Sequence, residues 1–215
     1  MGTADSKQFI PLLGTPAIAY TLRAFQACPL IDEIVVVCRA QDTERIRAVA
    51  DGNRIGKLRA VVEGGDTRSQ SVQNGLRAAD EKTAYVAIHD GARPLVTVEE
   101  ITAVCEAAFE TGAAAPGTPV TDTIKVVDGN NVIESTPDRA TLRAVQTPQV
   151  FERELYAFAL TDFGSGLDKV TDDCALIEQM GGEVQIVEGS YENIKLTTPI
   201  DVVIAESILQ KRNTL

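Results

Sequence analysis

The sequence predicts an α/β fold: a Rossmann-like, mainly parallel sheet flanked by helices, with a protruding β-hairpin arm. Apolar, β-branched runs such as residues 34–37 alternate with segments that have the apolar spacing of amphipathic helices. This alternation is typical of a parallel sheet built from strand–helix–strand units. It breaks after Pro119, where a polar hairpin pattern begins. For 215 residues we expect a single domain over 1–215, with the arm inserted at approximately 120–145.

The composition narrows the class of protein. Hydrophobic residues make up 44% and charged residues 24%, as in ordinary globular proteins. No apolar run approaches the roughly 18 residues that span a bilayer, and no secretory leader pattern is present, so we expect a cytoplasmic protein without a membrane partner. The net charge of −11 argues against nucleic-acid binding. A local cluster of basic residues can still bind a small phosphorylated substrate.

The cysteines do not indicate a metal centre. The four cysteines lie far apart, and the chain has a single histidine. A zinc site is therefore improbable, and reduced thiols in the core of a cytosolic protein are the better interpretation.

The first half of the chain gives the clearest secondary-structure signals. Thr15 and Pro16 are typical of a helix start, and Gly112 of a helix end. In chain order we expect a helix from Thr15 to Pro29, a strand over 33–38, a helix over 43–50, a weaker strand over 58–63, a helix after the turn 64–68, a strand over 84–88 and a helix over 98–110.

The second half begins with the predicted arm. Residues 121–127 and 132–135 read as the strands of a hairpin around the turn 128–131. Such an arm has little core of its own, so we expect it to pack on another chain. Beyond it we expect helices over 152–160 and 171–180, strands over 183–187 and 193–197, and a last helix, capped by Thr198 and Pro199, whose inward face is Ile200, Val203, Ile204 and Ile208.

The stretch from His89 to Pro94 is the strongest candidate site. It follows the apolar strand directly, and ligands of open α/β sheets bind beyond the carboxyl ends of the strands. Asp90 could bind a cation or a hydroxyl group and Arg93 a phosphate, while Gly91 allows a ligand close to the backbone. The alternative is a capped strand end with a surface ion pair.

Further polar residues stand where strands or turns end. They are Lys7, Gly65-Asp66, Asp122-Thr123, Arg139, Thr171-Asp172 and Lys195. Each alone is a weak signal. Together they predict a site that neutralises phosphates with lysine and arginine and orients them with hydroxyl groups. Phosphoryl and nucleotidyl transfers require such an electrostatic clamp more than covalent chemistry.

The sequence resembles the 2-C-methyl-D-erythritol 4-phosphate cytidylyltransferase family. The resemblance runs in register from residue 7 to the final helix. The stretches that carry it are Lys7-Gln8-Phe9, Gly64-Gly65-Asp66-Thr67-Arg68 with Ser71, His89-Asp90-Gly91-Ala92-Arg93-Pro94, Asp122-Thr123, Asp138-Arg139, Gln146-Thr147-Pro148-Gln149, Thr171-Asp172 and Asn193-Ile194-Lys195-Leu196-Thr197.

The resemblance implies an activity and its partners. Members transfer a cytidylyl group from CTP to the 4-phosphate of 2-C-methyl-D-erythritol, a step of non-mevalonate isoprenoid biosynthesis, and release pyrophosphate. It implies Mg²⁺ as cofactor, with other divalent cations as options, and CTP and a sugar-alcohol phosphate as ligands. It also implies a homodimer formed through the β-arm.

The resemblance also implies roles for individual residues. Lys7, Lys195 and Arg139 are expected to be catalytic, with Arg139 reaching the site from the partner's arm. The residues expected to bind the nucleotide are Gly65, Asp66, Ser71, Asp90 and Gly91. The residues expected to bind the second substrate are Asp90, Arg93, Thr123, Arg139, Thr171 and Lys195. Asp90 is also the expected metal ligand.

Each role has a simpler alternative. Lys7 could be a terminal charge, Lys195 a solvated lysine, Arg139 a partner of a nearby acid such as Asp138, and Asp66 a helix cap. At the level of function, the alternatives are a ribitol-5-phosphate cytidylyltransferase and an inactive dimerisation module of the same fold. A dinucleotide-dependent dehydrogenase is disfavoured, because no G-x-G-x-x-G follows a strand.

The chain departs from the family pattern at its start. The family opens with an apolar strand and a glycine-rich loop whose amides hold the triphosphate, and this sequence begins at what resembles the last Met-Gly of that loop. We therefore expect Met1 to be an internal methionine, with the natural start about twenty residues earlier by the length of such a strand and loop. We also expect little or no activity from residues 1–215 alone.

Overall fold

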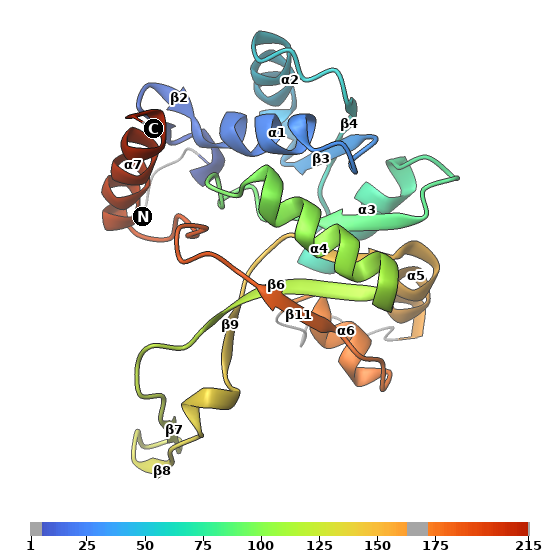
Figure 1. Cartoon of the computed structure of the whole chain (residues 1–215). Coiled ribbons are helices and arrows are strands. Elements are labelled where there is room, and N and C mark those ends of the chain that lie inside the picture. The colour runs from blue at the N-terminus through green and yellow to red at the C-terminus, as the bar shows by residue number, and fades with distance from the viewer. Residues whose placement is uncertain (1–5, 163–171, 215) are drawn as a thin grey trace.

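The computed structural model describes residues 6–162 and 172–214 of the chain (Figure 1). The helices are α1 (Ala17–Ala27), α2 (Thr43–Gly52), α3 (Arg68–Ala78), α4 (Val98–Thr111), α5 (Arg153–Asp162), α6 (Cys174–Gln179) and α7 (Pro199–Thr214), with 3₁₀ turns η1 (Lys7–Phe9), η2 (Ala40–Asp42) and η3 (Arg139–Thr141). The strands are β1 (Pro11–Leu12), β2 (Thr15–Pro16), β3 (Ile34–Cys38), β4 (Leu58–Glu63), β5 (Tyr85–Ile88), β6 (Ala113–Pro119), β7 (Val126–Val127), β8 (Ile133–Ser135), β9 (Arg143–Val145), β10 (Gln149–Glu152) and β11 (Gln185–Glu188).

The main sheet has five strands in the order β11-β6-β10-β5, with β9 also paired to β6. β11 runs parallel to β6, whereas β10 runs antiparallel to both β6 and β5. The α/β class is therefore confirmed, but this sheet is mixed rather than mainly parallel. The difference arises from β6, β9 and β10, which the sequence analysis did not predict. β6 reads Ala-Ala-Ala-Pro-Gly-Thr-Pro, a composition that is poor in the β-branched residues typical of strands.

A separate sheet holds β3 and β4, which pair in parallel from Ile34 opposite Leu58 to Cys38 opposite Glu63. These strands match the predicted ranges to within a residue. Val36 and Cys38 of β3 pack into a core cluster with Ile18 of α1 and Ile46 of α2. The alternation of side chains along β3 leaves Val35 and Val37 on the opposite face, where both are only partly buried.

Helices cover both faces of the main sheet (Figure 1). Ala114 of β6 packs with the buried face of α4, which includes Ile101 and Val104. Ala113 and Ala115 point to the other face and pack with Phe151 and with residues of α5 and α6. Because successive side chains of a strand point to opposite faces, β6 contributes residues to a core on each face of the sheet. All four cysteines are buried and free, as expected for reduced core thiols.

Several helix ends follow local sequence signals. Thr67 and Gln70 form a capping box at α3, and Thr97 with Glu100 forms one at α4. Gly112 adopts φ 85° and ends α4, as predicted. At α1 the prediction was wrong, because Thr15 and Pro16 pair with β1 and the helix begins at Ala17.

Three predictions near the carboxyl end also differ from the structure. Residues 193–197 are extended but form no strand, although the N–H of Leu196 donates to the carbonyl oxygen of Ala92 at 2.8 Å. Of the four residues expected on the inward face of α7, Ile200, Val203 and Ile204 are exposed, and only Ile208 packs against the core. Ala205 and Leu209 are buried instead. The predicted helix over 171–180 is shorter, since α6 begins at Cys174.

The β-hairpin arm protrudes from the body of the molecule (Figure 1). The chain leaves the sheet at Pro119 and returns in β9, which pairs with the end of β6, and β7 and β8 form the hairpin between them. Val126, Val132 and Ile133 are exposed in the arm. None of the helices in residues 6–162 and 172–214 has the length and apolar character needed to cross a bilayer.

Candidate functional site

An ion pair between Asp90 and Lys195 forms the centre of the candidate site. Oδ2 of Asp90 lies 2.7 Å from Nζ of Lys195. Asp90 follows β5 directly, and Lys195 belongs to the extended segment before α7. Burial raises the pKa of Asp90, but the hydrogen bond and charge of Lys195, with the charges of Arg68 and Arg93, outweigh it and hold the pKa below its ordinary value. Asp90 is therefore ionised at neutral pH.

Arg93 adds a second cation beside the same carboxylate. The backbone N–H of Arg93 donates to the carbonyl oxygen of Asp90 at 2.9 Å. This turn brings Arg93 back over the end of the strand. Its Nη1 donates to the carbonyl oxygen of Asn193 at 2.7 Å. Its Nε lies 3.9 Å from Oδ2 of Asp90, too far for a hydrogen bond, and is buried without an acceptor among the described residues. A buried donor in this state is suited to a ligand oxygen.

His89 and Thr147 hold the loop that carries both residues. The hydroxyl of Thr147 accepts the N–H of Asp90 at 3.1 Å and lies 3.0 Å from Nδ1 of His89. Nε2 of His89 lies 3.1 Å from the carbonyl oxygen of Arg93. Since that oxygen only accepts, Nε2 carries the proton and Nδ1 accepts from Thr147. Burial lowers the pKa of His89 to about 4, so the ring is neutral at pH 7.

Lys7 reaches the same region from the other end of the sequence. Its Nζ donates to the carbonyl oxygen of Thr197 at 3.4 Å, two residues beyond Lys195. The next residue, Gln8, lies near Gly91: a β-carbon on Gly91 would stand 3.8 Å from its Oε1 and 3.3 Å from Cδ1 of Ile18. Three of the predicted residues, Asp90, Arg93 and Lys195, therefore lie on the loop 89–94 and the segment 193–197, and a fourth, Lys7, contacts that segment.

The turn from Gly64 to Thr67 is closed by the first residues of α3. The N–H of Gly65 donates to Oγ of Ser71 at 3.1 Å, and the N–H of Asp66 donates to Oε1 of Gln70 at 2.7 Å. A β-carbon on Gly65 would lie 2.2 Å from Cβ of Gln70, so this position requires glycine. Thr67, not Asp66, caps the helix, so the interpretation of Asp66 as the cap is wrong. Asp66 lies on the exposed surface.

Arg68 links this turn to the site. Its positive charge lowers the pKa of Asp90, which places it within electrostatic reach of the Asp90–Lys195 pair. The guanidinium group makes two hydrogen bonds to the buried carboxylate of Asp173, whose Oδ1 also accepts the hydroxyl of Tyr156 at 2.5 Å. The turn 64–68 and the start of α6 are thus held together by a charge pair whose carboxylate is buried and whose guanidinium group is partly exposed.

The structure does not bring the arm residues to this site. Arg139 donates from Nη1 to the carbonyl oxygen of Thr121 at 2.6 Å, within the arm, and Thr123 is exposed there. The alternative, in which Arg139 pairs with a local acid such as Asp138, is not what the structure shows, because the guanidinium group makes this backbone contact instead. Thr171 lies outside the described residues, and its predicted role remains an expectation.

Asp90 is also the predicted metal ligand. Across residues 6–162 and 172–214 no group of three or more histidine, cysteine, aspartate or glutamate side chains is placed to hold a metal ion. Mg²⁺ commonly binds one or two carboxylates together with substrate phosphates, so a single carboxylate at a phosphate site fits that ion better than a dedicated metal cage does.

Several residues that build the site were not predicted to take part in it. Thr147, His89 and Asn193 lie in stretches that carry the family resemblance but had no expected role of their own, and Asp173 lies in none of these stretches. Their signal was weak because they act through hydrogen bonds between segments that are distant in sequence. Asn193, for example, donates from Nδ2 to the carbonyl oxygen of Thr147 at 3.0 Å.

The family known as 2-C-methyl-D-erythritol 4-phosphate cytidylyltransferase matches residues 1–211. This chain belongs to that family. A relative of that name from Desulforamulus reducens is 45% identical over 214 residues, which cover 99% of this chain and 92% of the relative. Another from Caldanaerobacter subterraneus is 45% identical over 216 residues, covering 98% and 93%. The match along most of each relative gives no support to the expected loss of activity.

Solved structures agree with this assignment. The crystal structure of 4-diphosphocytidyl-2C-methyl-D-erythritol synthase from Anaerococcus prevotii has a TM-score of 0.88 at 32% identity, covering 95% of this chain and 90% of that one. The 2-C-methyl-D-erythritol 4-phosphate cytidylyltransferase from Thermus thermophilus has a TM-score of 0.80 at 32% identity, covering 95% and 94%. The chain is thus a nucleotidyltransferase by family, with the family's α/β fold.

Proposed function

We propose that this chain transfers a cytidylyl group from CTP to 2-C-methyl-D-erythritol 4-phosphate. The observation that carries the proposal is the pair of cations at Asp90, Arg93 and Lys195, with Lys7 bound to the same segment at Thr197 and with a buried Nε of Arg93 that has no acceptor among the described residues. A site rich in cations, within a chain of net charge −11, is selective for small anions rather than for a polyanion.

The proposed reaction is a displacement at phosphorus. An oxygen of the substrate's 4-phosphate bonds to the α-phosphorus of CTP, and the bond from that phosphorus to the bridging oxygen of the β-phosphate breaks. Pyrophosphate leaves with the electron pair, and no covalent enzyme intermediate is required. Charge accumulates on oxygens around phosphorus, so cations that are already in position contribute most to the rate.

The cations divide between the two phosphate groups. Lys7 is suited to the triphosphate, and Arg93 and Lys195 to the incoming 4-phosphate. Asp90 holds Lys195 in place through the 2.7 Å ion pair and can accept a hydrogen bond from a ligand hydroxyl. The turn 64–71, with Gly65, Asp66 and Ser71, is proposed to bind the nucleotide. Gly91 gives the nucleotide close access to the backbone.

The proposed cofactor is Mg²⁺ or another divalent cation. Asp90 would hold it together with phosphate oxygens, and the bound ion would neutralise charge on the triphosphate. The fit rests on the lone carboxylate at the strand end, which leaves most coordination positions to the ligand and water.

We further propose that residues 1–215 act as a single cytoplasmic domain and form a homodimer through the arm at approximately 120–145. The exposed Val126, Val132 and Ile133 support an interface there, because apolar side chains on a slender hairpin are covered most readily by another chain. In the dimer, Arg139 and Thr123 would reach the partner's site, and Thr171 would complete the substrate contacts.

A hybrid-dimer assay tests this arrangement. Arg139→Ala and Lys195→Met are each expected to be inactive. If Arg139 acts across the interface, a mixed dimer has one site with both residues intact. Statistical mixing should then restore about a quarter of the wild-type activity. If Arg139 acts within its own chain, every mixed dimer stays inactive, which would exclude the arm proposal but leave the chemistry intact.

A pyrophosphate-release assay with CTP and Mg²⁺ tests the reaction itself. We expect turnover with 2-C-methyl-D-erythritol 4-phosphate. Preference for ribitol 5-phosphate would instead support the related cytidylyltransferase. An inactive chain that still dimerises, and that gives no heat on titration with CTP, would support the dimerisation module and contradict the proposal.

A further inference from the structure

The carboxylate of Asp42 is buried and lies outside the candidate site. Asp42 is the last residue of η2, directly before α2, and is 6% exposed. A buried charge is costly unless it is paired and hydrogen-bonded. Oδ2 of Asp42 accepts the hydroxyl of Ser6 at 2.7 Å and Nε of Arg39 at 3.0 Å. Nη2 of Arg39 also donates to Oγ of Ser6, so the three side chains form a closed triangle of hydrogen bonds.

Asp42 occupies the N-cap position of α2 but does not cap the helix. Aspartate is preferred at this position because its carboxylate accepts a backbone N–H of the first helical turn. The side chain of Asp42 makes no such hydrogen bond to α2, all of whose residues are described, and bonds to Ser6, 36 positions earlier in the sequence. The hydrogen bond from Ser6 lowers the pKa of Asp42, and burial does not outweigh it, so the carboxylate is ionised at pH 7. The charge therefore serves a distant segment rather than its own helix.

That segment carries Lys7, the cation proposed for the triphosphate, between two anchors. Ser6, bound to Asp42, precedes Lys7, and Phe9 follows it. Phe9 is 4% exposed, and the guanidinium group of Arg45 lies over its ring, 3.9 Å from the centroid. The N–H of Phe9 donates to the carbonyl oxygen of Ser6 at 2.9 Å, which closes the segment between the anchors. Both anchoring side chains, those of Asp42 and Arg45, come from η2 and α2.

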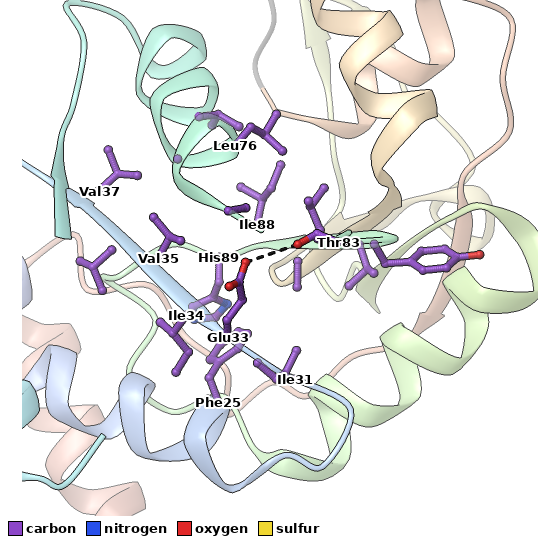
Figure 2. Close-up of a pocket in the computed structure, with 18 of the residues that line it drawn as sticks. Phe25, Ile31, Glu33, Ile34, Val35, Val37, Leu76, Thr83, Ile88 and His89 are labelled. Carbon is purple, nitrogen blue, oxygen red and sulfur yellow. Dashed lines mark hydrogen bonds between the residues drawn. The ribbon is translucent and has the colours of Figure 1, made fainter. Parts of the chain in front are cut away.

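The anchored segment borders the candidate site. Nζ of Lys7 donates to the carbonyl oxygen of Thr197 at 3.4 Å. Gln8 lines the cavity that Figure 2 shows, and so does His89, which precedes Asp90. A lysine ammonium group stands on a flexible stem of four carbons. Its position therefore depends on how firmly the backbone on both sides of Lys7 is held.

We propose that Asp42 is a positioning residue: by holding Ser6 it fixes the segment 6–9 and so places the ammonium group of Lys7 for the triphosphate. The proposal rests on the role of Lys7 in the proposed function. A misplacement of about 1 Å caused far from the reacting atoms can cost about 10² in rate, so the loss of this hold should be visible in kcat. The alternative is that the contacts of Asp42 only stabilise the fold. Their loss would then lower Tm and leave kcat per folded molecule unchanged.

Amide hydrogen exchange tests the hold on the segment without any substrate. In Asp42→Ala the N–H of Phe9 should exchange at least about tenfold faster, because opening the segment no longer breaks the Ser6–Asp42 hydrogen bond. Glu44→Ala is the matched control, since it removes a carboxylate from the same end of α2, where the side chain of Glu44 is 92% exposed. Exchange at Phe9 that is unchanged in Asp42→Ala would overturn the proposal.

A double-mutant cycle tests the effect on Lys7. Pyrophosphate release gives kcat for Asp42→Ala, Lys7→Met and the double variant. Asp42→Ala should lower kcat by about 10–10² with KM for the sugar phosphate nearly unchanged, and Lys7→Met should lower it by about 10²–10³. The double variant should be no slower than Lys7→Met, because the group that Asp42 positions is already absent. Losses that multiply in the double variant, or an unchanged kcat in Asp42→Ala, would overturn the proposal.

Two variants of Ser6 decide the question if Asp42→Ala does not fold. Ser6→Ala removes only the hydroxyl group and should lower kcat by about 10–10², whereas Ser6→Thr keeps a hydroxyl group and should retain most of the wild-type rate. Equal rates in these two variants would overturn the proposal. If the wild-type chain shows no turnover with CTP and the sugar phosphate, the proposed function fails, and faster exchange at Phe9 in Ser6→Ala still supports the hold on the segment.

Discussion

Nζ of Lys195 lies 2.7 Å from Oδ2 of Asp90 and joins the segment before α7 to the end of β5. The two charges neutralise each other in the free protein. A phosphate that binds here must share the ammonium group of Lys195 with Asp90. Before the phosphate binds, the carboxylate of Asp90 keeps that ammonium group in position. The pair is partly exposed, with 47% of the lysine side chain accessible, so its contribution to folding is small.

Replacement of Lys195 by methionine should therefore impair catalysis far more than folding. We expect kcat to fall by about 10²–10³, the effect of removing one charge-stabilising donor, with Tm nearly unchanged. Steady-state pyrophosphate release and thermal melting measure the two effects. Lys211→Met is the matched control, since Nζ of Lys211 lies 3.6 Å from Oε1 of Glu192 and pairs with that residue rather than with Asp90. Equal losses of activity in both variants would contradict the role of Lys195.

His89 should titrate far below the ordinary range. Burial lowers its pKa from 6.5 to about 4 in the folded protein. Between these values the unfolded chain binds a proton that the folded chain does not, so this residue makes the protein less stable as pH falls from 6.5 to about 4, and not further below. The chain has one histidine, so a single imidazole signal in an NMR titration gives the folded value directly.

The variant His89→Gln tests whether this imidazole causes the pH dependence of stability. In His89→Gln the part of the stability loss between pH 6.5 and about 4 that comes from the imidazole should disappear from urea unfolding curves. The same variant should raise KM for the phosphate substrate, because the Thr147–His89–Arg93 hydrogen bonds no longer fix the loop. A His89 signal that titrates near 6.5 would refute the buried, neutral ring.

The sequence predicted the first half of the fold better than the second, for physical reasons. β3 and β4 are dense in valine and isoleucine, and α4 has both a capping box and a terminal glycine. β6 has neither kind of signal, and it is a strand because its small residues allow helices to pack closely on both faces. In α7 apolar residues occur on more than one side, so only the contacts with Leu12 and Leu196 decide that Ala205 and Leu209 face inward.

The residues of the candidate site also divide into those that the sequence could predict and those that it could not. Asp90 and Arg93 could be recognised because they end a strand, and Lys7 and Lys195 because they belong to the stretches that resemble the family. Thr147, Asn193 and Asp173 could not, since each acts by hydrogen bonds to segments far away in sequence. Arg139 lies on an arm that does not approach Lys195 in this structure, so its expected role in the partner's site stays a prediction.

A β-carbon at position 65 should disrupt nucleotide binding. In Gly65→Ala the new atom would stand 2.2 Å from Cβ of Gln70, so the turn 64–67 must shift away from α3. We expect a loss of about 1–3 kcal/mol in unfolding free energy and an increase in KM for CTP of about tenfold. Gly56→Ala is the control, because nothing lies within 4 Å of its added carbon. An unchanged KM in Gly65→Ala would exclude this turn from the nucleotide site.

Asp201 should stabilise the last helix in a pH-dependent way. Its Oδ2 accepts the backbone N–H groups of Thr197 and Thr198 at 2.8 and 2.7 Å, which holds the pKa at about 2. Since the folded pKa is below the unfolded value of 3.8, the contribution is full above pH 3.8 and is lost as pH falls toward 2. Asp201→Ala should cost about 0.5–2 kcal/mol at pH 7, as for other helix caps.

Urea unfolding at pH 7 and at pH 2 measures this effect. The difference between wild type and Asp201→Ala should shrink at the lower pH. Asp51→Ala, at an exposed position near the end of α2, should change stability by less than about 0.5 kcal/mol at either pH. A difference between wild type and Asp201→Ala that does not depend on pH would show that the carboxylate charge is not what stabilises this helix end.

The contact between Lys7 and the carbonyl oxygen of Thr197 spans 190 positions of the sequence. Lys7 therefore leaves the ribosome long before the segment that it contacts. The ligand site can form only after synthesis has passed Thr197. A nascent chain that stalls before Lys195 has no means of holding a nucleotide and a sugar phosphate together.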